Sequence, residues 1–241
     1  MTMEDPPIVE MMSRGALLWR CLHRGPLTPA SIDQPDQEGK IPWAEFRGRN
    51  LRFIENLADT YGSCAVVARS GDRIIGHLRF YPKIVFDPLQ SGRGMCLQQE
   101  PPWGPDWNLK HRRFPPLEEI EDKSLVVHCM MVNSIGPGGE SLRRKGIGTR
   151  MARTLIDWAA GKGWRAIEST AYESLPIIYS ISGQTGRSFW EDLGFRPVKT
   201  EIEPALEEEN DFVRNMREEA RTQGLDPERI TNKYTMRLVL S

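Results

Sequence analysis

Hydrophobic and polar residues follow two different rhythms along the chain, and these rhythms outline its helices and strands. Over residues 42–61, apolar side chains return at near-helical spacing with Arg and Glu between them, which predicts a helix. The apolar runs at 64–68 and 73–80 flank Ser70-Gly71-Asp72, a sequence typical of a tight turn, and therefore predict an antiparallel hairpin. A shorter apolar run at 16–22 is consistent with a first strand.

The second half of the chain continues this pattern. Residues 125–132 form an apolar run that is typical of a buried strand. From Ile147 to Ala159 the apolar residues share one face of a helix, which we expect to end at Gly161 or Gly163. The elements expected after it are a strand at 164–171, a helix at 185–193, an extended segment at 195–202, a helix at 207–221 and a closing strand at 234–240.

These elements favour a single α/β domain over residues 1–241, since the closing strand could not bury its apolar side alone. Two segments depart from the pattern. Residues 1–40 are irregular, and residues 86–123 contain six prolines. A loop as long as 86–123 inside a compact domain is usually functional or disordered, so this insert is a candidate for function.

Composition and charge narrow the possible functions. Lys and Arg number 32 against 33 Asp and Glu, and the resulting net charge of −1 argues against a dedicated nucleic-acid-binding protein. No apolar run reaches the roughly 18 residues of a membrane span, and the acidic, proline-containing start of the chain does not follow the order of a secretory signal. We therefore expect a soluble, cytoplasmic protein that binds neither nucleic acid nor a membrane. The cysteines form no C-x-x-C pair, which favours reduced, buried thiols over a zinc site or a disulfide framework.

The segment 143–149 carries the clearest chemistry. It lies between a predicted buried strand and a predicted amphipathic helix, and Gly146 and Gly148 allow its backbone to approach an anion closely. The first turn of the helix adds N–H groups and the positive end of its dipole, and the basic residues at 143–145 add charged donors. The pattern is neither G-x-x-x-x-G-K-[ST] nor G-x-G-x-x-G. We expect a pyrophosphate held by another kind of loop.

The loop Arg143-x-x-Gly146-x-Gly148 resembles the pyrophosphate loop of the GNAT N-acetyltransferase superfamily, [RQ]-x-x-G-x-[GA], which lies between the fourth strand and the third helix. The segment Ser188-Phe-Trp-Glu-Asp-Leu-Gly-Phe195 is similar to the family's F-Y-E-x-L-G-F segment, and residues 71–80 resemble its third strand. The likeness covers residues 42–202 and the closing strand.

The resemblance implies an α/β fold with a mixed, mostly antiparallel central sheet flanked by helices, and with a long insert between strands 3 and 4. It implies acetyl-CoA or another acyl-CoA as the donor, with no metal. The acceptor would be an amine of a small molecule or a peptide, which attacks the acyl group directly. A homodimer is compatible with this assignment, because the family often dimerises.

The resemblance also implies which residues bind CoA. The acyl group and the pantetheine arm would contact the backbone of the fourth strand, with residues 168–170 of the fifth strand as the opposite wall, and the phosphates would contact the loop. The implied CoA-binding residues are Met130, Met131, Val132, Arg143, Arg144, Lys145, Gly146, Ile147, Gly148 and Thr149.

The candidates for proton transfer depart from the family pattern. The family often uses the tyrosine of F-Y-E to protonate the leaving thiolate, but this chain has Trp190 there, whose indole N–H is not a practical acid. Tyr172 and Tyr179 are substitutes on chemical grounds. His128 and Glu168 are candidates for the base that deprotonates the amine. Alternatively, His128 is a core histidine and Glu168 is a solvated carboxylate at a sheet edge.

The insert 86–123 is the expected cover of the acceptor site, because it follows the strand where the family binds acceptors. Its expected contacts are Trp103, Trp107, His111, Arg112 and Arg113, although the basic residues among them are equally compatible with a solvated surface patch. A non-catalytic acyl-CoA sensor or structural module on the same fold is the alternative function, favoured by Trp190. ATP binding is a further alternative, but no Walker lysine accompanies the loop.

Overall fold

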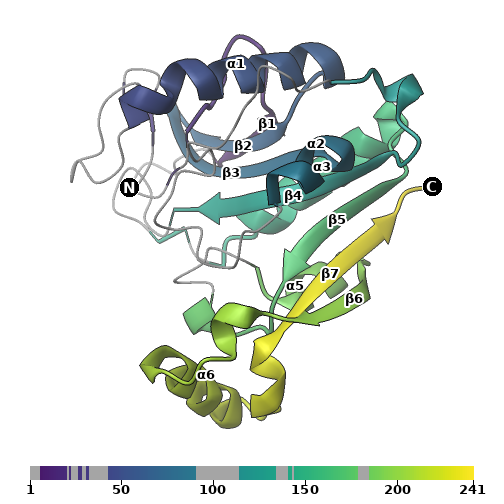
Figure 1. Ribbon diagram of the computed structural model, residues 1–241. Helices are drawn as coiled ribbons and strands as arrows, with labels where there is room; N and C mark the ends of the chain where they lie inside the picture. The colour runs from purple at the N-terminus through teal and green to yellow at the C-terminus, as the bar shows by residue number, and fades with distance from the viewer. Residues whose placement is uncertain are drawn as a thin grey trace.

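The computed structural model describes residues 6–20, 22, 27–28, 31–32, 43–90, 114–133, 141–142, 144–178 and 185–241. A seven-stranded sheet with the order β1-β2-β3-β4-β5-β7-β6 runs through the molecule (Figure 1). Its strands are β1 (Ile8–Met11), β2 (Ala65–Ser70), β3 (Arg73–Pro82), β4 (Ser124–Val132), β5 (Ala166–Ala171), β6 (Arg196–Ile202) and β7 (Asn232–Val239). The pair β4 and β5 is parallel and the other neighbouring strands are antiparallel. The predicted fold class, a mixed and mostly antiparallel sheet flanked by helices, is therefore confirmed.

Helices cover both faces of this sheet. They are α1 (Trp43–Tyr61), α2 (Lys83–Gln90), α3 (Ile147–Lys162), α5 (Arg187–Glu191) and α6 (Asp211–Thr222), with the short turns η2 (Leu117–Glu119), η3 (Pro204–Leu206) and η4 (Pro227–Thr231). Consecutive residues of a strand point to opposite faces, and β3 shows which helices share a face. Tyr81 contacts Phe53 of α1 and Phe86 of α2, whereas Phe80 contacts Trp158 of α3.

The first strand is not where the apolar run at 16–22 predicted it. The strand is β1, which pairs with β2 in the register Ile8↔Arg69. Leu18 of the predicted segment is buried in the main core instead. The guanidinium of Arg79 donates hydrogen bonds to the backbone carbonyls of Leu18 and Arg20, at 2.9 and 3.2 Å. These carbonyls are therefore bonded to a side chain, and the segment packs over the sheet rather than along its edge.

Two other boundaries differ from the prediction. The insert predicted at 86–123 contains some regular structure, because α2 extends through Gln90 and η2 spans Leu117–Glu119. The last helix begins at Asp211 rather than at 207, since the side chain of Asn210 caps it by accepting a hydrogen bond from the N–H of Val213 at 3.0 Å.

The far end of the insert is fixed to α1. The ring of Phe114 lies against Phe53, with 5.6 Å between their centroids. The hydroxyl of Tyr61 donates a hydrogen bond to the carbonyl of Pro115 at 2.8 Å, and burial raises the pKa of this phenol to about 12. The tyrosine thus stays a neutral donor over the ordinary pH range.

The chain between β6 and β7 adds a second, smaller core at the end of the sheet. The helix α6 and the turn η4 pack there against the segment that follows β5, at the lower end of Figure 1. The buried residues of this core are Tyr172, Leu175, Ile178, Leu206, Val213, Met216, Ala220 and Ile230.

A close backbone approach after β5 gives a test of this packing. A Cβ added to Gly186 would lie 2.6 Å from the Cα of Ser174, closer than real Cβ contacts come. We expect Gly186→Ala to lower the free energy of unfolding by about 1–3 kcal/mol, because backbone must move to admit the methyl group. Urea denaturation measures this loss.

The matched control is Gly161→Ala. Gly161 lies inside α3, and a Cβ there would meet nothing within 4 Å. Alanine should stabilise the helix at this position by about 0.5–1 kcal/mol. Equal effects of the two substitutions would contradict the close approach of Gly186 to Ser174.

Candidate functional site: the opening between β4 and β5

The parallel strands β4 and β5 pair over only part of their length. Ser124–Val127 of β4 pair with Ala166–Ser169 of β5, and both strands then continue without pairing to each other. Figure 1 shows the two strands separating beyond this point. The facing backbone edges beyond the paired part therefore form an opening in the sheet.

The backbone of β4 presents particular groups to this opening. Asn133 donates its N–H to the carbonyl of Ile75 at 2.9 Å, so the groups of Asn133 face β3. Because the direction of backbone groups alternates along an antiparallel pair, Met131 also faces β3, and the N–H and C=O of Met130 and Val132 face the opening. Met130 and Val132, two of the three residues predicted to contact CoA on this strand, thus have backbone groups that face the opening.

A β-bulge lies next to these residues. On β3 the pairing moves from Arg79 to Phe80, while on β4 it moves from Cys129 to Val127, so His128 is the additional residue. The ring of His128 lies 5.5 Å from that of Tyr81, which is on the α1 and α2 face. The bulge therefore changes the alternation of side chains where the opening begins.

The predicted pyrophosphate loop at residues 143–149 (the anion loop) leads into α3. Gly146 precedes the helix in a left-handed conformation, with φ of 69°. Among the described residues, the first hydrogen bond of the helix runs from the N–H of Arg150 to the carbonyl of Gly146, at 3.0 Å. The preceding N–H groups of the first turn lie at the positive end of the helix dipole. Arg144 and Lys145 are exposed beside them, so the start of α3 combines backbone donors with cations.

The start of α3 packs against the open part of β4. A Cβ on Gly148 would lie 3.5 Å from the Cε of Met130 and 3.8 Å from the Cε2 of Phe189 on α5. The anion loop, the edge of β4 that faces the opening and the helix α5 are thus neighbours. Ile147 anchors this turn, because its side chain is buried in the main core.

The candidate base Glu168 is held in ion pairs. Its side chain is buried, 3.2 Å from the Nζ of Lys83 on α2, and it also pairs with Arg237 on β7. Arg237 donates a further hydrogen bond to Ser124 Oγ at 3.2 Å. The alternative of a solvated carboxylate at a sheet edge is wrong, since β5 lies inside the sheet. The carboxylate joins α2, β5 and β7.

The candidate acid Tyr172 lies in the smaller core. Its side chain is buried, and its hydroxyl donates a hydrogen bond to Glu203 at 2.9 Å. The phenol is thus engaged by a carboxylate on the β6 side of the molecule. The other candidate acid, Tyr179, lies outside the described residues.

The tryptophan at the position of the family's tyrosine is buried. Trp190 is 1% exposed, and its ring packs against Phe189 and Phe195. In the described part of the chain, no hydrogen-bond acceptor meets its indole N–H. This group can donate a hydrogen bond but cannot supply a proton.

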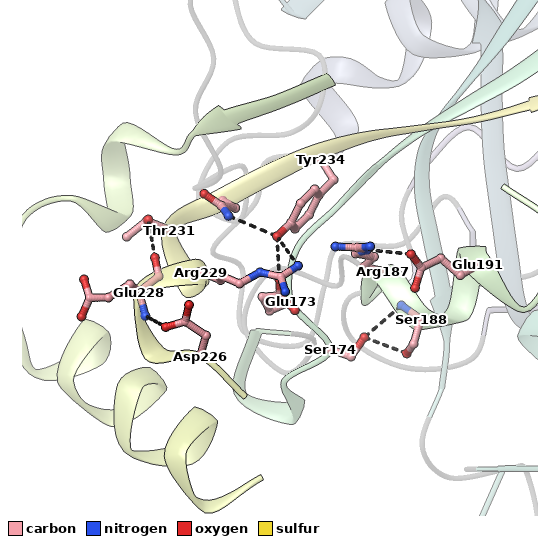
Figure 2. A network of polar contacts seen from close by, with 11 residues as sticks. Glu173, Ser174, Arg187, Ser188, Glu191, Asp226, Glu228, Arg229, Thr231 and Tyr234 are labelled. Carbon is pink, nitrogen blue, oxygen red and sulfur yellow. Dashed lines mark hydrogen bonds and ion pairs between the residues drawn. The ribbon is translucent and has the colours of Figure 1, made fainter. Parts of the chain in front are cut away.

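Two polar arrangements were not predicted from the sequence. In the first, the hydroxyl of Tyr234 donates to Glu173 at 2.6 Å and Arg229 donates to the same hydroxyl, while Ser174 bonds Ser188 nearby (Figure 2). These contacts connect the end of β5 with α5, η4 and β7. The second is a hydrogen bond between His77 on β3 and Cys129 on β4. Both depend on which strands are neighbours, which the sequence alone does not show.

The remaining predicted site residues lie outside the described residues. They are Arg143 of the loop and the five insert residues Trp103, Trp107, His111, Arg112 and Arg113. Within the described ranges, no three His, Cys, Asp or Glu side chains gather closely enough to hold a metal ion. Among the described helices, none has the length and apolar character needed to cross a membrane.

No protein-family model and no curated protein matches this chain. Solved structures are similar at low identity. An acetyltransferase of the GNAT family from Streptococcus pneumoniae is 11% identical, with 98% of this chain and 100% of that chain covered and a TM-score of 0.49. An N-acetyltransferase from Staphylococcus aureus Mu50 is 13% identical, with the same coverage and a TM-score of 0.44. For an IAA acetyltransferase from Bacillus cereus ATCC 14579 the identity is 14%, the coverage is again the same and the TM-score is 0.42.

The strand order and strand directions of the chain, with a parallel pair that separates beside a glycine loop and a helix, agree with the sheet that the sequence resemblance implies.

The ion pairs of Glu168 give a second test. We expect Glu168→Gln to lower the free energy of unfolding by about 1.5–3 kcal/mol, because Lys83 and Arg237 lose the carboxylate that they share. Thermal and urea denaturation measure the loss.

The control is Glu201→Gln, which removes an exposed ion pair with Lys199 at 2.8 Å. Exposed pairs contribute less than about 1 kcal/mol. A loss in Glu168→Gln no larger than that of the control would show that Glu168 does not join the three elements.

Proposed function

We propose that this chain is an acyl-CoA-dependent N-acyltransferase of the GNAT type, which transfers an acetyl group from acetyl-CoA to an amine. One observation carries the proposal. The first turn of α3, with its N–H groups and exposed cations, packs against the part of β4 whose backbone faces the opening. A donor with a pyrophosphate at one end and amide groups along its arm matches both surfaces at once.

The phosphates of the donor would bind at the start of α3. The N–H groups of the first turn and the positive end of the helix dipole favour an anion there. Arg144 and Lys145 add two exposed cations, and the left-handed Gly146 leaves its surroundings open, since a Cβ there would meet nothing within 4 Å. These groups fit a pyrophosphate without a metal ion.

The pantetheine arm would run along β4. Its amides can exchange hydrogen bonds with the backbone N–H and C=O of Met130 and Val132, which have no neighbouring strand on that side. The N–H of Met130, next to the bulge, is a suitable donor to the thioester carbonyl oxygen. Such a donor would stabilise the negative charge that the oxygen gains in the transition state.

His128 is the base that we propose for the attacking amine. It lies in the bulge beside the rings of Tyr81 and Phe86, and a neutral imidazole can accept a proton from an amine. Glu168 is the weaker candidate, because its carboxylate already pairs with two cations.

The experiment that tests the proposal is calorimetric titration of acetyl-CoA. We expect Gly146→Glu to weaken binding by about 100-fold, or about 2.7 kcal/mol, since it places a carboxylate at the proposed pyrophosphate site. The matched control is Gly163→Glu. Gly163 ends the same helix, also has positive φ and also has open space around its Cβ position.

Both substitutions place a glutamate at a position with positive φ and so introduce the same backbone strain, but the two positions lie at opposite ends of α3. Only Gly146→Glu should therefore weaken the binding of acetyl-CoA. Equal affinities in the two variants would contradict the phosphate site. Binding of acetyl-CoA without release of CoA in a screen of amines would instead favour the alternative, a non-catalytic acyl-CoA sensor.

The acceptor is proposed to lie under the insert. Both described ends of the insert lie on the α1 and α2 face, through Phe86 and Phe114, which is the face that His128 shares. We expect replacement of residues 91–113 by a short Gly-Ser link to lower kcat/KM for the amine while the Kd for acetyl-CoA stays the same. Steady-state kinetics with varied amine measures the first and calorimetry the second. Unchanged amine turnover would exclude the insert from the acceptor site.

A further inference from the structure

An ion pair joins the start of α2 to β5. Lys83 is the first residue of α2, and its Nζ lies 3.2 Å from one carboxylate oxygen of Glu168. The side chain of Glu168 is buried, and its other carboxylate oxygen pairs with Arg237 of β7. A buried carboxylate that loses one of its cations keeps a charge that is only partly compensated, so this ion pair is costly to break. It therefore fixes the start of α2 over the sheet.

The register of the sheet explains why the lysine reaches this carboxylate. Tyr81 of β3 pairs with Val126 of β4, and Val126 pairs with Glu168 of β5. Residues directly opposite each other on neighbouring strands point to the same face. These three residues thus form a row on the face that α1 and α2 cover. Since α2 follows β3 directly and packs against β3 and β4, its first residue can extend along this row to β5.

The same helix contacts the proposed base. Phe86 lies one turn after Lys83, and its ring is 5.9 Å from that of His128 in an edge-to-face arrangement. The ring of Tyr81 is 5.5 Å from His128 and 6.4 Å from Phe86, so the three rings contact one another in pairs. In such close packing, the position of Phe86 limits how the imidazole can turn. The ion pair at the start of α2 therefore also influences the orientation of His128.

We propose that Lys83 is a positioning residue, which pairs with Glu168 and so holds α2 where Phe86 orients the imidazole of His128 toward the amine. This inference rests on the proposed function, in which His128 is the base. The orientation matters because proton transfer requires the nitrogen of the base within hydrogen-bond reach of the amine. Glu168 thus takes part in the reaction through Lys83, without accepting the proton itself.

This arrangement separates the acceptor reaction from the binding of the donor. Lys83 pairs with Glu168 on β5 and with Asp87 on α2. The proposed donor site consists instead of the edge of β4 that faces the opening and the start of α3. Loss of the ion pair should therefore lower the rate at which the bound amine is deprotonated and leave the Kd for acetyl-CoA the same.

Steady-state kinetics with varied amine and calorimetry with acetyl-CoA test the inference in Lys83→Met, which removes the cation and keeps an unbranched side chain. We expect kcat to fall by at least about 10-fold, because a misplaced base loses much of its effect. The Kd for acetyl-CoA should stay within about twofold of the wild-type value. Lys83→Arg keeps a cation within reach of Glu168 and should restore most of the lost kcat. Circular dichroism checks that each variant is folded.

Asp87→Asn is the matched control. The carboxylate of Asp87 pairs with the same lysine, 3.0 Å from its Nζ, but 54% of the Asp87 side chain is exposed. Because exposed ion pairs contribute little, this variant should keep kcat within about twofold of the wild-type value. A loss of kcat as large as that of Lys83→Met would contradict the specific part of Glu168 and overturn the inference.

A double-mutant cycle tests whether Lys83 acts through Phe86. Phe86→Leu removes the ring that lies against His128. If Lys83 works by placing this ring, adding Lys83→Met to Phe86→Leu should lower kcat by less than about twofold further, because the two residues then act as a unit. A further loss of about 10-fold in the double variant would overturn the route through Phe86.

Hydrogen exchange measures the attachment of α2 without any substrate. The backbone N–H groups of α2 should exchange faster in Lys83→Met than in the wild type, because the helix opens more often once its ion pair with β5 is lost. Those of α3 should exchange at the wild-type rate. Unchanged exchange in α2 would overturn the inference, whatever the kinetics show.

The outcomes separate the inference from the proposed function. A wild-type kcat in Lys83→Met would overturn the positioning role of Lys83 and leave the acyltransferase standing. Absence of acetyl-CoA binding by the folded wild type in calorimetry would overturn both, because His128 would then have no reaction to assist.

Discussion

The early end of the pairing between β4 and β5 is the constraint on which the site depends. Four residue pairs hold these parallel strands together, from Ser124↔Ala166 to Val127↔Ser169. Beyond them, β4 stays in the sheet only through β3, and β5 stays in it through β7. Backbone groups that would otherwise bond across the sheet are left facing the opening, and a ligand with amide groups can satisfy them.

Three features maintain this separation. The bulge at His128 lies just after the last shared pair, and bulges bend a strand and increase its twist. On the β5 side, Glu168 ties the paired part of the strand to α2 and β7. Past the pairing, the polar contacts of Glu173 with Tyr234 and Arg229 fix the end of β5 to the C-terminal part of the chain. The strands thus diverge because each is held by a different neighbour.

The sequence predicted the elements well where the spacing of apolar residues was regular, as in α1, the β2–β3 hairpin and α3. The prediction of the first strand was wrong, because the apolar run at 16–22 is more hydrophobic than the short edge strand β1. A segment that packs over the face of a sheet needs the same apolar residues as a buried strand, so the run does not distinguish the two. The loop before α3 was recognisable because its glycines and cations are consecutive. The surroundings of Glu168 and Tyr172 were not, since their partners Arg237 and Glu203 are distant in the chain.

The pair of His77 and Cys129 shows the same limit. Their contact depends on the register between β3 and β4, and the bulge shifts that register by one residue at a place that no sequence pattern marks.

The attachment of the insert at both ends has an evolutionary consequence. Phe86 packs on the sheet at one end, and Phe114 and Pro115 are held by α1 at the other. Substitutions, insertions and deletions between these anchors can accumulate without moving β3, β4 or the anion loop, because lengthening a loop costs little once its ends are fixed. In the proposed acyltransferase, a lineage could therefore change the amine that is acetylated through this one segment, while the donor site between β4 and β5 stays the same.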